Sequence, residues 1–256
     1  DDGGTNRGAV WVLFLRPDGQ VKAHQKISQT AGGFAGLIDD HDQFGTAVDR
    51  IHDLNGDGVP ELLVGANSSD DGGERRGSVW ILFLDTDGTV KHQQKISQTE
   101  GGFGGELGDG DRFGIGVGRI GDLDGDGRDE IAVGAFAHDT GGTNRGSVWV
   151  LFLSPQGMVT RTVLVADQTN GFGGTLDDFD YFGAAVAGPG DLDGDGIPDL
   201  AVGARRDDDG GLDRGGVWTL RLMADGTVGG WHKISATSGG FAGTLASGVV
   251  TKGDAV

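Results

Sequence analysis

The sequence predicts an all-β protein built from repeated four-stranded antiparallel sheets. Glycine supplies 53 of the 256 residues and recurs between short apolar runs. Long helices therefore have almost no room, because each Gly inside a helix costs about 1 kcal/mol relative to Ala. The apolar runs have the length of strands and are separated by turn-forming residues. The same set of motifs also returns at a constant interval, which indicates a repeat protein.

The repeat has the length of the interval from Trp11 to Trp80, and about four copies follow one another without insertions. A fixed period of this kind is typical of solenoids, arrays and propellers, in which each unit buries its apolar surface against the next. A column of aromatic residues at constant spacing is best interpreted as the core of a repeating unit. The repeated aromatic positions are Trp11, Trp80, Trp149 and Trp218; Phe34, Phe103, Phe172 and Phe241; and Phe44, Phe113 and Phe182, each of which precedes a Gly.

One copy contains four predicted strands. The third of them has apolar residues on both faces, which predicts burial on both sides. A tight turn follows it, and the other copies carry Asp-Gly at that turn, a strong hairpin signal. The strands are expected at 113–120, 130–135, 147–153 and 158–166, with turns at 122–130 and 154–157.

Four antiparallel strands that are apolar on both faces favour a blade of a β-propeller, because each blade is packed between two neighbours. A β-solenoid is the main rival, but its coils are much shorter than this repeat. We expect a single propeller domain or propeller fragment with three complete blades and incomplete or shared terminal strands. The blades are expected at about 44–97, 113–166 and 182–235, and the terminal strands at 9–28 and 241–256.

Charge and composition exclude several functions. The formal net charge is −19, so binding to nucleic acid through phosphate neutralisation is not expected. Cys is absent, which excludes a disulfide framework and a thiolate metal site. The longest apolar run, at about 9–15, is far short of the roughly 20 residues that span a bilayer, so membrane insertion is not expected. The chain starts within a repeat, which suggests a processed protein or a piece of a longer one.

Three copies carry an acidic loop with the pattern Asp-x-(Asp/Asn)-x-Asp-Gly-x-x-(Asp/Glu). Calcium takes six to eight oxygen ligands, and alternate side chains converge when a backbone curls around an ion. Gly at the sixth position permits the turn, and the seventh position would offer its backbone carbonyl. The candidate ligands are Asp53, Asn55, Asp57, Val59 and Glu61; Asp122, Asp124, Asp126, Arg128 and Glu130; and Asp191, Asp193, Asp195, Ile197 and Asp199.

These loops predict about three Ca²⁺ ions, one in each. An EF-hand needs a bidentate Glu at position 12, whereas these loops have Val there and place the last carboxylate at position 9. Mg²⁺ is disfavoured because it prefers a smaller octahedral site that retains water. The alternative is an ordinary Asp-Gly turn without an ion, but three such loops in register would hold carboxylates that repel one another.

The Phe-Gly pair, the acidic loop and a strand that ends in Val-Gly-Ala follow one another in each copy, the last at 64–66, 133–135 and 202–204. This order resembles the FG-GAP repeat of integrin α subunits and of many bacterial surface proteins. The resemblance covers nearly the whole chain. It implies a blade whose inner strand starts at Phe-Gly, calcium in the hairpin loop between the first two strands, and an extracellular role in adhesion or assembly.

The copy number departs from this family, whose propellers usually have seven blades. The fourth copy ends near 252–253, without a fourth acidic loop. The two ends could close into a small ring, or the chain could belong to a longer propeller. Self-association, in which one chain completes the incomplete terminal blade of the next, is a third hypothesis.

Two further repeated features have a structural and a functional interpretation. An Arg followed by Gly precedes each Trp-bearing strand, at Arg7, Arg76, Arg145 and Arg214. We expect these residues to pair with an Asp of a connecting loop; the alternative is a ring of cations for an acidic glycan or partner. The Phe of each Gly-rich segment is expected to fill the gap between blades, and the alternative is an exposed aromatic for sugar stacking or partner contact.

The sequence contains no recognisable catalytic motif, and near-identical copies argue against one unique active site. We therefore expect a non-enzymatic, calcium-stabilised structural or adhesion module, extracellular or at the cell surface. Its expected partners are proteins or surface glycans, and by analogy with integrins the end with the long loops would meet them. A lectin-like glycan-binding propeller and an accessory propeller of a larger secreted enzyme are the alternatives.

Overall fold

The structure is a computed structural model that describes residues 2–245, in which fourteen strands and no helix are found. The strands form one two-stranded and three four-stranded sheets, all antiparallel and each paired in sequence order. The expected all-β fold of four-stranded blades is therefore confirmed. The first sheet contains β1 (Val10–Leu15) and β2 (Val21–Ile27).

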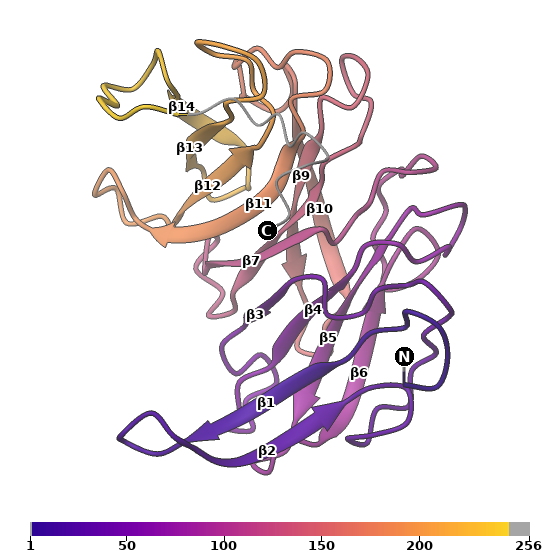
Figure 1. Cartoon of the computed structure of the whole chain (residues 1–256). Helices are drawn as coiled ribbons and strands as arrows, with labels where there is room; N and C mark the ends of the chain where they lie inside the picture. The colour runs from indigo at the N-terminus through magenta and orange to yellow at the C-terminus, as the bar shows by residue number, and fades with distance from the viewer. Residues whose placement is uncertain (1, 246–256) are drawn as a thin grey trace.

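The three complete sheets follow one another along the chain (Figure 1). They are formed by β3 (Val48–Arg50), β4 (Leu62–Ala66), β5 (Ser78–Leu84) and β6 (Val90–Ile96); by β7 (Gly116–Gly121), β8 (Glu130–Ala135), β9 (Ser147–Leu153) and β10 (Val159–Ala166); and by β11 (Phe182–Gly190), β12 (Asp199–Ala204), β13 (Gly216–Leu222) and β14 (Val228–Ile234).

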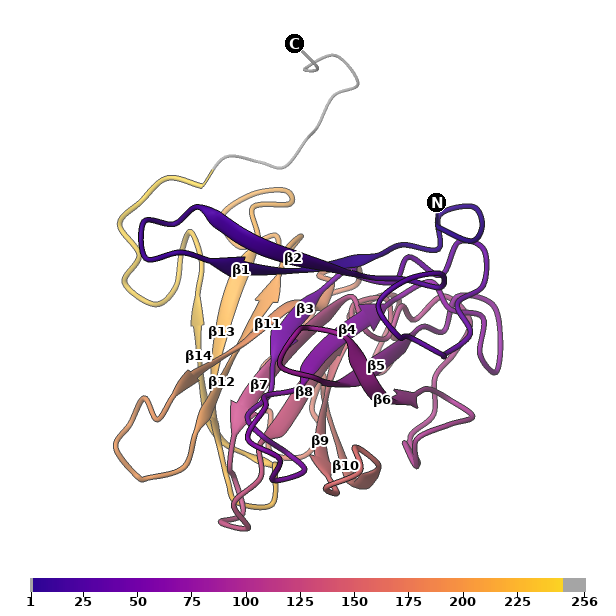
Figure 2. The same ribbon diagram turned by 90° about the horizontal axis from the view of Figure 1, so that it is seen from below.

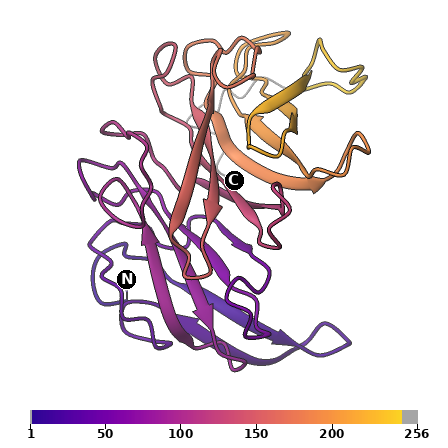
Figure 3. The same cartoon turned by 180° about the vertical axis from the view of Figure 1, so that it is seen from behind.

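The first strands β3, β7 and β11 lie next to one another on the inner side of the array, as the blades of a propeller do (Figure 1). The hairpins of third and fourth strands form the outer side of the array. In the view from behind the molecule, the β9–β10 hairpin lies nearest the viewer (Figure 3). Seen from below, the β1–β2 sheet lies across one end of the array (Figure 2). This arrangement places the loops between first and second strands together at one end of the sheets.

The inner strands begin later than the sequence predicts in two of three blades. β7 starts at Gly116, whereas Phe113 forms an isolated parallel bridge with Gly77. Gly114 adopts φ +91°, a left-handed conformation that turns the chain before the strand begins. The Phe-Gly pair therefore ties one repeat to the preceding one before it opens the blade.

The first two complete sheets each bury two different faces. The tryptophan face carries the Trp of the third strand, such as Trp80, with Leu82 two residues later. The valine face carries the residue before that Trp, such as Val79, with Ile81 and Ile96. Buried clusters join the valine face of each sheet to the tryptophan face of the next sheet in the chain. Because both faces are covered, β9 is buried along its whole length, as expected.

The Phe of the Gly-rich segment fills the space between sheets, as the sequence predicts. Phe34, Phe103 and Phe172 are buried, and each lies edge-on to the Trp of the next sheet, with ring centroids 5.0, 5.0 and 5.2 Å apart. The neighbouring Gly36 permits this contact, since a Cβ there would lie 2.5 Å from the Trp80 ring. Close packing between sheets therefore requires Gly at position 36.

The repeated Arg residues are structural in three of the four copies. The Nε atoms of Arg7, Arg76 and Arg145 lie 2.7, 2.8 and 2.9 Å from the Oδ1 atoms of Asp40, Asp109 and Asp178, respectively. The expected pairing of Arg with a loop Asp is thus confirmed there. The equivalent position for Arg214 is 247, which lies outside the described residues.

The strands expected near the start of the chain are found, whereas no strand is found in the described part of the segment expected near its end. The terminal strands expected at 9–28 are found as β1 and β2. Of the segment expected at 241–256, residues 241–245 form no strand, and residues 246–256 lie outside the described residues.

Candidate functional sites

Each acidic loop connects the first and second strands of a blade. Glycines at its fourth and sixth positions adopt positive φ, for example +79° at Gly56 and +86° at Gly58. These angles are strained for other residues, so the two glycines set the curl of the loop. The sequence pattern predicted a turn-forming Gly at the sixth position of the loop. The structure shows that the Gly at the fourth position is equally necessary for the curl.

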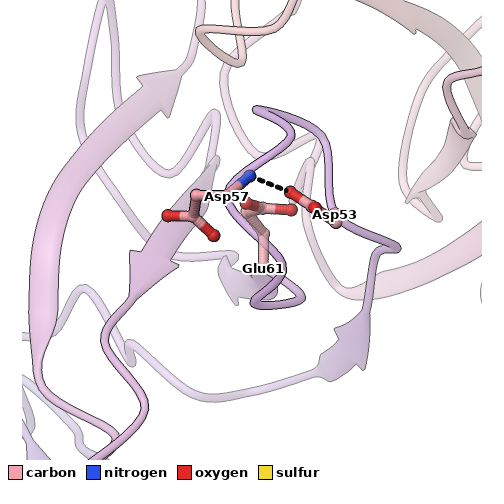
Figure 4. A group of neighbouring side chains, drawn as sticks. All are labelled: Asp53, Asp57 and Glu61. Atoms are coloured by element: carbon pink, nitrogen blue, oxygen red, sulfur yellow. Dashed lines mark hydrogen bonds between the residues drawn. The ribbon is translucent and has the colours of Figure 1, made fainter.

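Three carboxylates of the first loop lie close together (Figure 4). One oxygen each from Asp53, Asp57 and Glu61 lie within 4.8 Å of one another. Asp53 Oδ1 accepts from the amides of Gly56 and Asp57 at 2.7 and 2.9 Å, and its Oδ2 accepts from Gly58 at 2.6 Å. These bonds orient Asp53, so the backbone curl and the acid side chains support each other.

The second and third loops repeat this arrangement with one change. Their three converging carboxylates come from positions 1, 3 and 9, whereas the first loop, which has Asn55 at position 3, uses positions 1, 5 and 9. The guanidinium of Arg128 contacts Asp126 in the second loop and donates to the Leu153 carbonyl at 3.1 Å. The clusters are Asp122, Asp124 and Glu130, and Asp191, Asp193 and Asp199.

The ninth-position carboxylates are buried, with Glu61, Glu130 and Asp199 each 1% exposed. Burial raises the pKa of Glu61 to about 7 and that of Glu130 to about 8, and it raises the pKa of Asp199 as well. One backbone amide donates to each glutamate, Leu54 at 2.7 Å and Leu123 at 2.6 Å, and nearby aspartates add repulsion. A buried carboxylate held among other carboxylates is costly unless a cation offsets it.

This donor set fits a hard divalent cation. Two oxygens bound to one Ca²⁺ at 2.3–2.6 Å lie at most about 5 Å apart, and the three oxygens of each cluster meet that limit. Backbone carbonyls at position 7 would add ligands at Val59, Arg128 and Ile197; their role stays a prediction. Each of the three clusters could therefore hold a metal ion.

Without calcium, we expect the protein to melt several degrees higher at pH 5 than at pH 8. The carboxyl groups with raised pKa values, which include Asp42 and Asp180 at about 6, stabilise the fold while protonated. That contribution is lost as pH rises through 6 to 8. Carboxyl groups with lowered pKa values change their contribution to stability only below about pH 4, so they do not oppose this trend between pH 5 and pH 8. Thermal melts in chelator at several pH values test it, and a higher melting temperature at pH 8 would contradict it.

Three cations contact the loop carboxylates and were not anticipated from the sequence. Lys91 Nζ lies 2.8 Å from Asp57 Oδ2, and Arg161 Nη2 lies 3.5 Å from Asp124 Oδ2. Arg221 Nη1 lies 3.6 Å from an Asp193 oxygen in the third loop. These three cations occupy different positions in the repeat, so no periodic signal marks them. They partly neutralise the loops from the neighbouring outer strands.

The opposite end of the sheets carries residues that differ between copies. Where one copy has Gln43, the next two have Arg112 and Tyr181, although the adjacent Asp and the Phe-Gly pair are the same in all three. All three variable residues adopt positive φ, between +58° and +63°. The residue that follows the second strand varies in the same way, as Asn67, Phe136 and Arg205.

The variable residues form an aromatic and cationic cluster beside the third blade. Phe136 lies edge-on to Tyr181, with ring centroids 5.0 Å apart. The guanidinium of Arg205 lies 4.6 Å from the Phe136 centroid and 5.0 Å from that of Tyr181, and Arg206 lies 5.0 Å from the same tyrosine ring. Phe179 is 47% exposed beside them. We call Phe136, Phe179, Tyr181, Arg205 and Arg206 the aromatic–arginine cluster.

A cavity of about 500 Å³ opens at the same end, near the first complete blade. Arg112 lines it, and its guanidinium donates to the Ser68 hydroxyl. Burial lowers the pKa of Arg112, and the cavity wall also carries Asp70 and Glu74. This end of the molecule therefore offers both a hollow and an aromatic surface, while the acidic loops occupy the other end.

Among the described residues, no helix is long and apolar enough to cross a membrane.

Comparison with known proteins finds the FG-GAP repeat model at residues 44–82, 117–151 and 182–220. Integrin alpha-5 of Xenopus laevis is 34% identical over 166 residues, which cover 63% of this chain and 14% of that protein. Integrin alpha-3 of Cricetulus griseus is 30% identical over 202 residues, or 78% of this chain and 17% of that protein. The chain thus spans less than a fifth of the length of these relatives. The chain therefore contains three FG-GAP repeats, the blades of a β-propeller, and is similar to the integrin α subunits.

Proposed function

We propose that this chain is a non-enzymatic, extracellular adhesion module, stabilised by calcium, that binds a protein partner through its long-loop end. The similarity to integrin α subunits supports a role in adhesion and a place at the cell surface. In this proposal residues 44–97, 113–166 and 182–235 are three complete blades of one propeller domain. Nucleic acid is not a partner, because the net charge is −19.

Calcium is proposed as the ion of the three acidic loops. The carboxylates at positions 1, 3, 5 and 9 and the carbonyl at position 7 would bind it, with Asn55 supplying an amide oxygen in the first loop. The ion would join the loop between the first and second strands into one rigid turn and neutralise the buried ninth carboxylate. Oxygen ligands from a flexible loop suit Ca²⁺ better than the strict octahedron of Mg²⁺.

The observation that carries the partner-binding proposal is the difference between copies at the long-loop end. Repeats that agree in their Phe-Gly pairs, ion loops and Trp strands diverge at Gln43, Arg112 and Tyr181. Packing alone would favour the same residue in each copy, so divergence supports a role specific to one surface. Aromatic and Arg side chains also dominate the energy of protein interfaces, which favours the aromatic–arginine cluster as the contact.

We expect substitution of Tyr181 or Arg205 by Ala to weaken partner binding at least about tenfold, the effect of losing one interface hot spot. The probe is a panel of immobilised extracellular-matrix proteins, measured by surface plasmon resonance in millimolar calcium. The matched control is Leu192→Ala, an exposed residue 52% accessible at the ion-loop end. Equal loss in the control, or no binding to any protein of the panel, would overturn the proposal. Binding to a glycan array alone would favour the lectin-like alternative.

A further inference from the structure

One buried carboxylate of the second acidic loop is hydrogen-bonded to the first acidic loop. Asp129 stands at the eighth position of the second loop, directly before the candidate ligand Glu130, and is 5% exposed. Its Oδ2 atom accepts from the backbone amide of His52 at 2.8 Å, and the His52 Nδ1 atom lies 3.3 Å from the same oxygen. His52 directly precedes Asp53, the first candidate ligand of the first loop. The bond therefore joins residues that each stand next to a candidate ligand.

Arg119 of β7 reinforces this link between the two blades. Its Nε atom donates to Asp129 Oδ2 at 2.6 Å, and its backbone amide donates to Asp49 Oδ2 at 2.8 Å. Asp49 lies in β3, the strand that leads into the first loop. Hydrogen bonds between charged groups are stronger than neutral ones, so Arg119 holds the Asp129 carboxylate firmly in place.

Only the second loop carries this link. The equivalent eighth positions of the first and third loops are Pro60 and Pro198, whose side chains cannot accept a hydrogen bond. Within residues 2–245, no hydrogen bond or ion pair joins the second loop to the third. The two loops meet by packing instead, since a Cβ at Gly121 would lie 2.9 Å from Pro198. The first and second loops are therefore linked more directly than the second and third.

We propose that Asp129 couples the first two loops, so that calcium in the second raises the affinity of the first, and the reverse. This inference rests on the proposed binding of calcium. When Glu130 is held by an ion, Asp129 beside it is held as well. The fixed carboxylate then holds the His52 amide and the backbone that carries Asp53, so the first loop loses less conformational freedom on binding its own ion. Such coupling is reciprocal.

A glycine amide in each loop offers a separate signal for each site. The amides of Gly58, Gly127 and Gly196 donate to the first Asp of their own loops, at 2.6, 2.9 and 2.8 Å. Because this Asp is a proposed ligand, ion binding changes the surroundings of the amide. NMR spectra of the backbone amides of the 256-residue chain, recorded during a calcium titration, therefore give one affinity for each loop.

Removing one ligand from the second or the third loop tests the coupling. Asp122→Ala should lower the calcium affinity of the first loop at least about fivefold, the lower end of coupling between two sites. Asp191→Ala makes the same change in the third loop and should leave the affinity of the first loop unchanged. Both variants remove one negative charge, so the comparison controls for charge. An equal effect of the two variants on the first loop, or no effect of Asp122→Ala, would overturn the inference.

Asp129→Pro tests the link itself. Pro is the residue of this chain at the same position of the other two loops, so the variant is expected to fold, which circular dichroism checks. Asp129→Ala is a second variant that removes the acceptor without the constraint of Pro. In either background Asp122→Ala should no longer lower the affinity of the first loop, and a persisting loss would overturn the role of Asp129. Glycine signals that respond independently would contradict the coupling alone, whereas signals that do not respond to calcium would contradict the calcium proposal.

Discussion

The protein is expected to melt roughly 10 °C higher in millimolar calcium than in chelator, given the gain per ion and the size of the domain. At a dissociation constant near 10⁻⁴ M, common for extracellular sites, one bound ion adds about 1.4 kcal/mol to the free energy of unfolding. Three clusters of converging carboxylates then add about 4 kcal/mol. Each kcal/mol raises the melting temperature of a domain of this size by about 2–4 °C. Differential scanning calorimetry with and without the ion measures the shift.

The same melt in millimolar magnesium is the control. Magnesium holds its water and demands an octahedron near 2.0–2.1 Å, so it should raise the melting temperature much less. A chelated sample that melts with the calcium-loaded one would contradict the calcium proposal, provided elemental analysis shows that the ion was removed. An equal effect of magnesium would contradict the assignment of the ion.

Strand positions in the middle and outer parts of each blade could be predicted from the sequence. The ranges expected at 130–135 and 147–153 are those of β8 and β9, because each is a short, mainly apolar run bounded by turn-forming residues. The face contacts between sheets follow from alternation along the same strands. Because the period of the repeat is constant, the strand positions predicted in one copy could be predicted in every copy.

The inner strands and the long-loop cluster could not be predicted in the same way. β7 begins at Gly116 and not at Phe113, whereas β11, whose Phe182 makes the same bridge to the preceding repeat, begins at Phe182 as expected, so the repeated motif alone does not set the start of an inner strand. The cation–π contacts of Arg205 join residues far apart in sequence. Positions that vary between copies give no repeated sequence signal, and only the folded structure shows that they lie together at one end of the sheets.

The acidic loops could be predicted from the sequence only in part. The pattern predicted the candidate ligands, but only the folded loop shows that Asp57 converges in the first copy while Asp124 and Asp193 converge in the others. Asn at position 3 of the first loop coincides with this change, since an amide there removes one carboxylate. Contacts from Lys91 and the two arginines depend on strand register and have no counterpart in the pattern.

Replacing Glu130 by Gln is expected to stabilise the protein much more in chelator than in calcium. In chelator at pH 8 the variant should be more stable by roughly 2 kcal/mol, because a neutral amide replaces a buried carboxyl whose pKa is raised to about 8. In calcium this gain should shrink to about 0.6 kcal/mol, because the variant does not receive the roughly 1.4 kcal/mol that one bound ion contributes to the parent. Urea unfolding at pH 8 in both solutions measures both differences.

The dependence of this gain on calcium separates a metal ligand from a buried structural acid. A Glu that only contributed packing and accepted the Leu123 amide would lose stability on substitution in both solutions. A bare acidic turn would gain the same stability in both, since no ion ever offsets its burial. Glu106→Gln, at a glutamate outside the loops, should change neither curve. A gain at Glu130 that is large in chelator and small in calcium therefore requires that the carboxylate is costly alone and favourable with the ion, which is what the buried ninth position of each loop predicts.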